Sequence, residues 1–221
     1  MDGTAQAMSE QALSIDPAPV PVWRQPRVLD RVEQVGILLL WSWFILRVGE
    51  AHNPFAWLAA VSETSVAVFT LIRRPTSAIS VRLGDWMLAM TATLAPLMVV
   101  FGESRWPQLL PLCVVLVVCG NLFQIWAKLT LRRSFGIAPA NRGIKRGGPY
   151  RYVRHPMYAG YLFNHLGVLL MWPSLINLAA YGIGWTAQIL RLRAEEELLG
   201  QDASYREFMG QTRWRLLPGI F

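Results

Sequence analysis

Residues that could do chemistry gather in two polar segments in the second half of the chain. The first is a basic and aromatic loop that leads into an apolar run: Gly148-Pro149-Tyr150-Arg151-Tyr152-Val153-Arg154-His155-Pro156-Met157-Tyr158-Ala159-Gly160. The second, Arg191 to Glu197, places two arginines ahead of three consecutive glutamates. One apolar hairpin separates the two segments, so both return to the same side of it. We take them together as a candidate ligand-binding site.

The basic loop offers groups that suit a polar, partly aromatic ligand. Residues 128–154 hold eight Lys or Arg and no acidic residue, a run that on its own is typical of a loop beside anionic lipid. Within it, the glycines of residues 142–149 allow the backbone to approach a ligand. Aromatic faces for a heterocycle or a sulfonium cation come from Tyr150, Tyr152 and Tyr158. Pro156 suits the first turn of a helix, which places His155 near the N-cap.

The second segment continues an apolar run and is expected to be helical. Arg191 and Glu195 stand at i, i+4, as do Arg193 and Glu197, and ion pairs at this spacing stabilise a helix. These pairs leave Glu196 without an assigned partner. Because three adjacent glutamates repel one another, we expect at least one to bind a ligand or a cation from the 128–154 loop.

The elements that must position these segments are strongly apolar. Hydrophobic residues make up 53% and charged residues 16% of the chain, against about a quarter charged in soluble domains. The mean hydropathy is +0.32. Runs of a length suited to crossing a bilayer lie near 32–48, 54–72, 86–101, 108–126, 157–172 and 174–190. We therefore predict an all-α, polytopic membrane protein with about six transmembrane helices, or five and one partly crossing hairpin, followed by a C-terminal helix.

The positions of the basic residues predict the topology. Of 21 Lys and Arg, 19 fall in residues 24–31, 73–82, 128–154 and 191–215. With six spans and both termini inside, the positive-inside rule is obeyed by all four segments. The net charge of +7 is then a topology signal with a contribution from anionic lipid, and nucleic-acid binding is not expected.

This arrangement divides the chain into three regions. Residues 1–31 form a cytoplasmic N-terminal tail, and residues 32–126 form the first transmembrane helices. Residues 127–221 contain both polar segments and form the functional region. An integral membrane protein of this kind resides in the inner membrane of a bacterium or the endoplasmic reticulum of a eukaryote.

One carboxylate falls inside a predicted span. Glu63 is costly there unless it is paired or protonated, so it is either functional or paired within the bundle. We expect pairing with a polar side chain such as Asn121, Gln124 or Gln188, and no contact with a cofactor. Asn121 and Gln124 share a helix face, where they either line a polar pocket or bond neighbouring helices.

The remaining chemically versatile residues are expected to be structural. His155 and His165 are about 15 Å apart along a helix and so do not ligate one metal, and we expect no metal site. His165 is expected to form a hydrogen bond between helices. Cys113 and Cys119 are expected to pack without a disulfide, and Gly182 and Gly184 to allow close helix contact.

Taken together, the two segments resemble the isoprenylcysteine carboxyl methyltransferase family of integral membrane enzymes. The phospholipid N-methyltransferases are more distantly similar. The matching residues are Trp126-Ala127, Arg133-Ser134-Phe135, the 148–160 loop, Arg191 to Glu197, Tyr205 and Leu217-Pro218. They cover about residues 120–221, whereas the first half matches only in having membrane spans. The loop followed by the arginine and paired glutamates is the specific part of this pattern.

The resemblance implies methyl transfer from S-adenosylmethionine. In that family the loop and the double-glutamate helix enclose the cofactor at the cytoplasmic face, and a lipid substrate enters from the bilayer. The catalytic arginine and the essential glutamate of the family fall on Arg191 and Glu196. The expected cofactor-binding residues are Gly148, Pro149, Tyr150, Tyr152, Arg154, His155, Tyr158 and Glu195.

The expected acceptor is a lipophilic or prenylated molecule from the bilayer, most simply the carboxylate of an isoprenylcysteine-like compound. One departure from the family pattern bears on this expectation. The stretch between Glu196 and Tyr205 is shorter than in the eukaryotic enzymes and lacks their Phe-Gly pair. A lipid-amine N-methyltransferase and a non-catalytic lipid- or sterol-binding module therefore stay open as alternatives.

Overall fold

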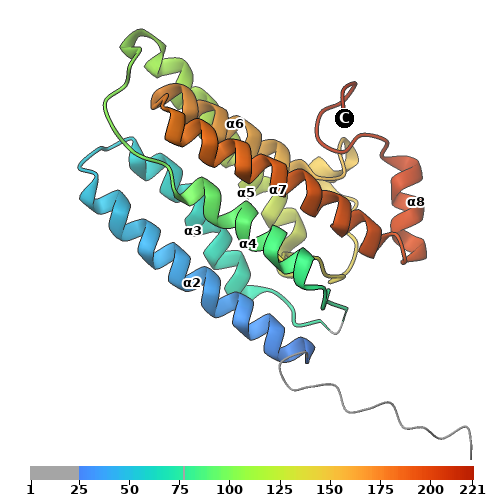
Figure 1. Cartoon of the computed structure of the whole chain (residues 1–221). Helices are drawn as coiled ribbons and strands as arrows, with labels where there is room; N and C mark the ends of the chain where they lie inside the picture. Colours follow the sequence, from blue (N-terminus) through green and yellow to red (C-terminus); the bar gives the residue numbers. More distant parts are fainter. Residues whose placement is uncertain (1–24, 77) are drawn as a thin grey trace, which may run out of the picture.

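The computed structural model describes residues 25–76 and 78–221, and over these residues it is all-helical. Its α-helices are α2 (Pro26–Glu50), α3 (Ala56–Ile72), α4 (Leu83–Leu97), α5 (Leu110–Leu131), α6 (Pro156–Met171), α7 (Leu175–Leu199) and α8 (Ala203–Gln211) (Figure 1). No β-strand occurs in this part of the chain, and one isolated bridge joins Ile79 to Ala140. Most of the predicted N-terminal tail lies outside the described residues.

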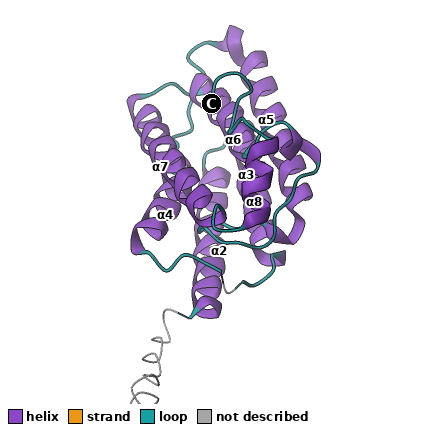
Figure 2. Cartoon of the chain, turned by 90° about the vertical axis from the view of Figure 1, so that its right-hand side faces the viewer, coloured by secondary structure: helices purple, strands orange, loops and turns teal. Residues whose placement is uncertain are grey.

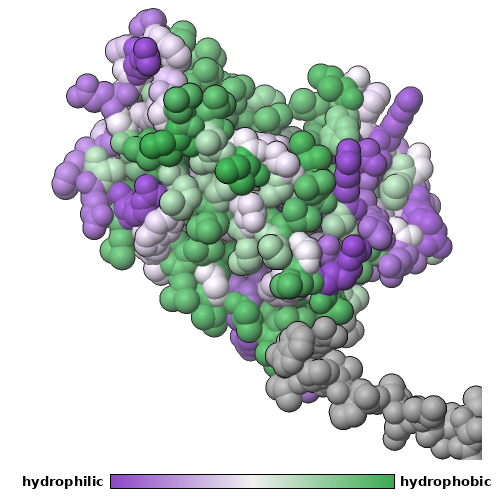
Figure 3. Space-filling model, viewed as in Figure 1, coloured by the Kyte–Doolittle hydropathy of each residue, from purple (hydrophilic) through white to green (hydrophobic). Residues whose placement is uncertain are grey.

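Each apolar run predicted as a span coincides with one of the helices α2 to α7. Two helical stretches, Pro26–Glu50 and Pro107–Ser134, are long and apolar enough to cross a membrane, and Ala56–Ile72 is a shorter apolar helix. The face of the molecule in Figure 3 is largely hydrophobic, with hydrophilic groups toward its two sides. Large apolar side chains such as Leu39 and Leu122 are more than half exposed on these helices. The helical architecture is confirmed, while six crossings stay a prediction.

The closest helix packing joins α5 and α6, and glycine makes it possible. A Cβ atom on Gly120 would lie 2.6 Å from the backbone nitrogen of Asn164, and one on Gly160 would lie 2.8 Å from that of Gln124. Small residues of this kind let the backbones of membrane helices approach. The expectation for Gly184 is confirmed, because it packs against Pro96 of α4. The expectation for Gly182 is wrong, because a Cβ atom there would meet nothing within 4 Å.

Buried amides join the helices through their side chains. Asn121 Nδ2 donates to the Leu58 carbonyl oxygen (2.8 Å), and Gln124 Nε2 donates to Ser62 Oγ (3.0 Å). Asn164 Nδ2 donates in turn to Asn121 Oδ1 (2.6 Å). These contacts join α5 to α3 and α6, so of the two roles left open for the amides, bonding between neighbouring helices is the one found.

The second half of the chain brings both polar segments to one end of the bundle. His155 is the N-cap of α6 and Pro156 its first residue, as predicted. α6 and α7 form the predicted hairpin, in which Ser174 Oγ caps α7 by accepting from the Asn177 backbone N–H (3.1 Å). α7 carries Arg191 to Glu197 beyond the apolar part of the helix, and α8 follows beside this end (Figures 1 and 2). The 132–155 loop, the end of α7 and α8 therefore enclose a common space.

Candidate functional site

A cavity that is partly open to solvent lies between the 131–145 segment, the start of α6, the end of α7 and α8, with about 690 Å³ of empty space when its open mouth is included. We call it the loop cavity. Five of the ten residues predicted for the site line it: Tyr150, Arg154, His155, Tyr158 and Glu195. The two polar segments do meet, and a pocket lies between them.

The tyrosines of the loop cavity are buried and available as hydrogen-bond donors. Tyr158 Oη donates to Glu195 Oε2 (3.0 Å). Burial raises the pKa of Tyr150 well above its usual value, and the carboxylate of Glu195 raises it further. Tyr205 also lines the cavity, and its buried hydroxyl has no hydrogen-bond partner in the described part of the protein. Burial and the nearby Glu196 raise the pKa of Tyr205 too, so both phenols stay protonated.

Glu196 lies beside the loop cavity in a cluster of cations. Its Oε1 atom accepts from Arg154 Nε (2.7 Å) and lies 3.2 Å from His155 Nε2, while Oε2 accepts from Arg215 Nε (2.7 Å). Burial raises the pKa of Glu196, but the hydrogen bonds from His155, Arg154 and Arg215 outweigh it and hold the pKa well below its usual range. The expectation that one glutamate binds a cation of the 128–154 loop is confirmed.

The cluster joins three segments that are distant in sequence. The Arg154 backbone N–H donates to the Trp214 carbonyl oxygen and that of His155 to the Arg215 carbonyl oxygen, both at 2.8 Å. Glu196 thereby connects α7 to the loop and to the C-terminal segment. Its side chain lines neither the loop cavity nor the second cavity described below.

Arg191 occupies the boundary of the site and is buried with part of its guanidinium unpaired. Nη2 donates to the Gly136 carbonyl oxygen (3.3 Å) and Nη1 to Gln188 Oε1 (3.4 Å), both long contacts. Cζ lies 5.5 Å from the centre of the Tyr158 ring, and Nε has no partner among the described residues. The guanidinium therefore has donor capacity to spare.

The ion pairs expected along α7 are not found. Arg191 does not pair with Glu195, because Glu195 instead accepts from Tyr158 across the loop cavity. Glu197 lies 3.6 Å from Arg82, and both of these side chains are exposed. The i, i+4 rule fails here because the tertiary contacts of the buried face orient Arg191 and Glu195 away from each other.

A second cavity, also partly open, extends among α3, α4, α6 and α7, with about 390 Å³ of empty space when its mouth is included. We call it the bundle cavity. Arg191 and Gln188 line it from α7 and Glu63 from α3, and the other lining residues are Val66, Ala92, Thr93, Pro96, Phe135, Ile137, Tyr161 and His165. It combines an apolar wall with a few convergent polar groups, as ligand sites do.

Two sequence expectations concern residues of the bundle cavity. Among the described residues no hydrogen bond joins Glu63 to Asn121, Gln124 or Gln188, the partners given as examples, since these amides bond to other groups. The polar groups that interact with Glu63 are Lys128 of α5 and Ser62, so it does pair within the bundle, but with other partners. His165 forms no hydrogen bond between helices through Nδ1, which is buried and unpaired. Its ring instead stacks on Tyr181, with centroids 4.7 Å apart. The position of Glu63 relative to a cofactor stays a prediction.

The other predicted cofactor residues shape the loop and do not line the loop cavity. Gly148 and Pro149 begin a short 3₁₀ turn, Gly148–Arg151. Gly148 has a φ of +56°, and a Cβ atom there would lie 2.7 Å from Thr130 Oγ1, so glycine is required at this turn. Tyr152 is 67% exposed and does not line the cavity.

Sequence reasoning missed the wall of the loop cavity that lies between Ser134 and Lys145. Gly136, Ala138 and Arg142 line this wall, together with the hydroxyl-bearing Tyr205 of α8. From the sequence, Arg142 was only one of the basic residues in the 128–154 loop, and no role was predicted for it. Its burial next to acidic residues of α2 depends on long-range packing that no local pattern reveals.

The family comparison covers the part of the chain that builds this site. Residues 110–203 match the family model described as phospholipid methyltransferase. This segment runs from the start of α5 to the start of α8 and contains both polar segments. The resemblance to membrane methyltransferases is confirmed over this segment. No curated protein matches the chain.

Proposed function

We propose that the protein transfers a methyl group from S-adenosylmethionine to a lipophilic acceptor that enters from the bilayer. The observation that carries this proposal is the placement of Arg191 and Tyr158. Arg191 lines the bundle cavity, Tyr158 lines the loop cavity, and the guanidinium lies 5.5 Å from the tyrosine ring. A donor and an acceptor bound in the two cavities would meet at this pair.

The loop cavity suits the cofactor. S-adenosylmethionine, when bound, supplies a methyl group activated by a sulfonium cation. Tyr150 and Tyr158 offer aromatic faces for the cation and the adenine ring. Glu195 offers a carboxylate for amino or hydroxyl donors. The unpaired hydroxyl of Tyr205 is a buried polar group that lacks a partner, and a bound ligand would provide one.

The bundle cavity suits an acceptor with an anionic reactive group. Arg191 Nε is buried without a partner, and the two Nη contacts are long. A carboxylate can therefore bind to the free Nε–H and to the second N–H of Nη2 as a bidentate pair, while Nη2 keeps its contact with Gly136. Alignment of a nucleophile in this way can lower the barrier by several kcal/mol without any group in the chain changing its covalent state. An isoprenylcysteine-like acid meets these requirements, with its tail in the apolar part of the bundle.

A lipid amine is the second candidate, and Glu63 is the observation that favours it. Its carboxylate lines the same bundle cavity as Arg191 and could hold an ammonium group. The phospholipid methyltransferase family match is consistent with an acceptor of this class. Arg191 would then act on another part of the acceptor or on the cofactor side.

Binding and kinetics of Arg191 variants test the proposal. Purified protein in detergent is titrated with S-adenosylhomocysteine by calorimetry, and we expect saturable binding by wild type and by Arg191→Ala. Turnover should fall in Arg191→Ala by about 100-fold or more, because nucleophile alignment is lost. Arg191→Lys should recover little, since an ammonium group makes no planar bidentate contact.

Arg193 is the matched control, because it is exposed on the same helix and forms no ion pair in the described part of the protein. Arg193→Ala should behave as wild type. Wild-type turnover in folded Arg191→Ala would remove the carboxylate-holding role and favour the amine. Failure of S-adenosylhomocysteine to bind wild type would favour a non-catalytic lipid-binding module.

A further inference from the structure

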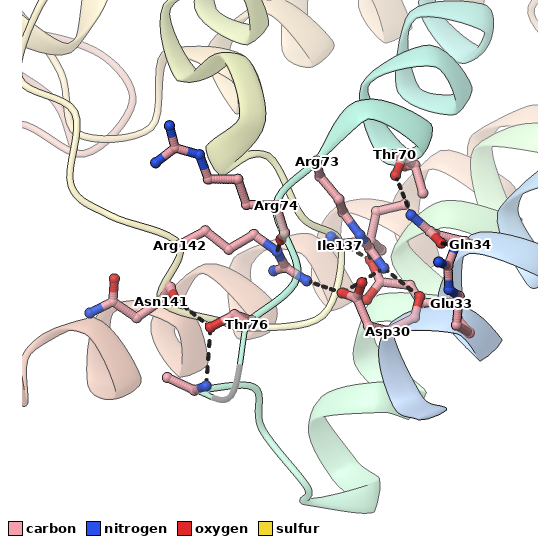
Figure 4. A network of polar contacts seen from close by, with 12 residues as sticks. Asp30, Glu33, Gln34, Thr70, Arg73, Arg74, Thr76, Ile137, Asn141 and Arg142 are labelled. Atoms are coloured by element: carbon pink, nitrogen blue, oxygen red, sulfur yellow. Dashed lines mark hydrogen bonds and ion pairs between the residues drawn. The ribbon is translucent and has the colours of Figure 1, made fainter. Parts of the chain in front are cut away.

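A buried network of four charged side chains, of which only Arg142 lines one of the two cavities, lies where α2 and the end of α3 meet the 132–155 loop (Figure 4). Asp30 and Glu33 extend from α2, and Arg73 follows α3. Arg73 pairs with Glu33 and with Asp30 Oδ1 (3.0 Å), and Arg142 Nη2 pairs with the same Asp30 oxygen (2.6 Å). All four side chains are at most 8% exposed.

Stability of the fold alone does not explain why these four buried side chains are charged. Burying ions costs desolvation energy, and a well-packed apolar cluster is often as stable as a buried ion pair. Glu33 Oε2 and Arg73 Nε even lack partners among the described residues. Charged groups can form directional hydrogen bonds to a particular backbone atom, which an apolar cluster cannot do.

Two of those directional bonds hold the segment 135–142. Glu33 Oε1 accepts from the Ile137 backbone N–H (2.8 Å). Arg142, fixed by Asp30, donates through Nε to the Arg74 carbonyl oxygen (3.0 Å). Its guanidinium lies directly against Gly136, where a Cβ atom would collide with Nη1.

The held segment separates the two cavities. Gly136, Ala138 and Arg142 line the loop cavity, whereas Phe135 and Ile137 line the bundle cavity. The Gly136 carbonyl oxygen also accepts from Arg191 Nη2 (3.3 Å). The backbone segment that Asp30 and Glu33 hold is therefore the one that accepts the hydrogen bond from Arg191.

We propose that Asp30 and Glu33 are positioning residues. They fix the segment 135–142, which we call the partition because it separates the two cavities. Through the Gly136 carbonyl oxygen, the partition sets the orientation of Arg191. The proposal assigns a role to α2, which lies outside the segment that matches the family model. It rests on the proposed function for its kinetic consequences, but the anchoring of the partition is independent of that function.

Hydrogen exchange followed by mass spectrometry tests the anchoring. Glu33→Ala should accelerate exchange in the peptide that contains Ile137 by about tenfold, because one backbone hydrogen bond is lost. Glu33→Gln should keep it near wild type, since the amide oxygen still accepts from Ile137. Glu50→Ala is the control, as Glu50 is exposed at the other end of α2. If Glu33→Ala does not fold, the double variant Glu33→Leu with Arg73→Leu replaces the ion pair by an apolar pair and should give the same acceleration.

Kinetics separate positioning from a purely structural role. Glu33→Ala should lower turnover and raise the acceptor KM several-fold, with affinity for S-adenosylhomocysteine changed less, because Ile137 faces the bundle cavity. Asp30→Ala should chiefly weaken S-adenosylhomocysteine binding, because it frees Arg142 on the loop cavity wall. Glu33→Gln should restore turnover.

The outcomes distinguish this inference from the proposed function. Unchanged exchange at 135–142 in folded Glu33→Ala, or in the Leu double variant, overturns the anchoring. Accelerated exchange with unchanged turnover and KM overturns the positioning of Arg191. If wild type binds no S-adenosylhomocysteine, the proposed function fails, while the exchange experiment still decides whether the acidic pair fixes the partition.

Discussion

At the scale of single residues, some polar groups of the site have several partners, and others are buried without a partner. The carboxylate of Glu196 has partners at both oxygens, since Arg154, His155 and Arg215 surround it. Arg191 Nε and Tyr205 Oη are buried and unpaired. Buried polar groups normally have partners, so the unpaired ones mark where a ligand would add contacts. We therefore propose that Glu196 holds the loop in place, whereas Arg191 and Tyr205 contact bound molecules.

The unpaired hydroxyl of Tyr205 leads to a first prediction. Tyr205→Phe removes a buried group that has no partner in the described structure, so the free protein should be equally stable or slightly more so. Affinity for S-adenosylhomocysteine should fall several-fold, because the hydrogen bond to the ligand is lost. Thermal melts and calorimetric titration measure the two effects. Tyr152→Phe, at an exposed tyrosine, should change neither.

An affinity that stays at the wild-type value in Tyr205→Phe would remove Tyr205 from the cofactor site. A marked loss of stability would show that the hydroxyl has a partner in the free protein.

The contacts of Glu196 with Arg154, His155 and Arg215, which we call the clamp, lead to a second prediction. Glu196→Gln should destabilise the protein by roughly 2 kcal/mol, because buried Arg154 loses its charged partner. Glu207→Gln, in the exposed pair with Arg146, is the matched control and should change the stability little, because solvent screens this pair. Thermal unfolding in detergent measures both. Equal effects of the two substitutions would show that the clamp contributes no more than a surface pair.

The same clamp predicts a pH dependence with a definite sign. The pKa of Glu196 is held below its usual range in the folded protein, so its contribution is fully present above the ordinary glutamate pKa of 4.5. The contribution is lost as the pH falls from there toward the folded pKa. The stability difference between wild type and Glu196→Gln should therefore be constant near neutral pH and narrow below about pH 4.5. A difference that widens on acidification would contradict the assignment.

Sequence could predict which residue types meet at the site, but not how each is used. The loop and the arginine–glutamate helix were identifiable because both lie in short, unusual runs. The orientation of Glu195 toward Tyr158 and of Glu196 toward Arg154 depends on how α7 is rotated against the loop. That rotation is set by packing of apolar side chains over the whole helix. The acidic pair of α2 was invisible for the same reason, because its partners Arg73 and Arg142 are distant in sequence.

At the scale of elements, the α5–α6 contact positions the basic loop. α5 leads into the loop, α6 leaves it, and the glycines between the two helices set their separation. Apolar runs in the sequence were sufficient to predict both helices, along with the cap at His155 and the α6–α7 hairpin. They did not reveal which glycines are contact points, because an apolar run has no polar face to indicate rotation. Gly160 and Gly167, which both pack against α5, were therefore not predicted as contact points, and Gly182 was predicted as one incorrectly.

This contact leads to a third prediction. Gly160→Ala should destabilise the protein by about 1–3 kcal/mol and lower S-adenosylhomocysteine affinity, because the added methyl group overlaps Gln124 of α5 and pushes α6 and the loop away. Gly182→Ala is the control. Its methyl group would meet nothing within 4 Å, and alanine favours a helix, so stability should be unchanged or higher.

Melting temperatures of the two glycine variants and titration with S-adenosylhomocysteine measure these effects. Equal stability of Gly160→Ala and Gly182→Ala would contradict the close α5–α6 packing.

At the scale of the whole molecule, the arrangement matches a protein that works at a membrane face. The elements that carry the polar segments, the loop cavity and the charged network meet at one end of an apolar bundle (Figure 1), and the face in Figure 3 is largely hydrophobic. With six crossings this end faces the cytoplasm, where 19 of 21 basic residues would lie. A reporter enzyme fused after Phe221 should be active only in the cytoplasm. Activity of a periplasmic or lumenal reporter there would overturn this topology.

The central claim is tested most directly by methyl transfer itself. Wild-type protein in detergent is incubated with S-adenosylmethionine labelled in its methyl group, and with either prenyl-thiol acids or a total lipid extract. The account predicts label in an organic-soluble product of the acid, and alkali should release it as methanol because the product is an ester. Alkali-stable label in a lipid amine would contradict the carboxylate assignment and support the amine. Absence of label from every acceptor, with S-adenosylhomocysteine failing to bind, would contradict methyl transfer altogether.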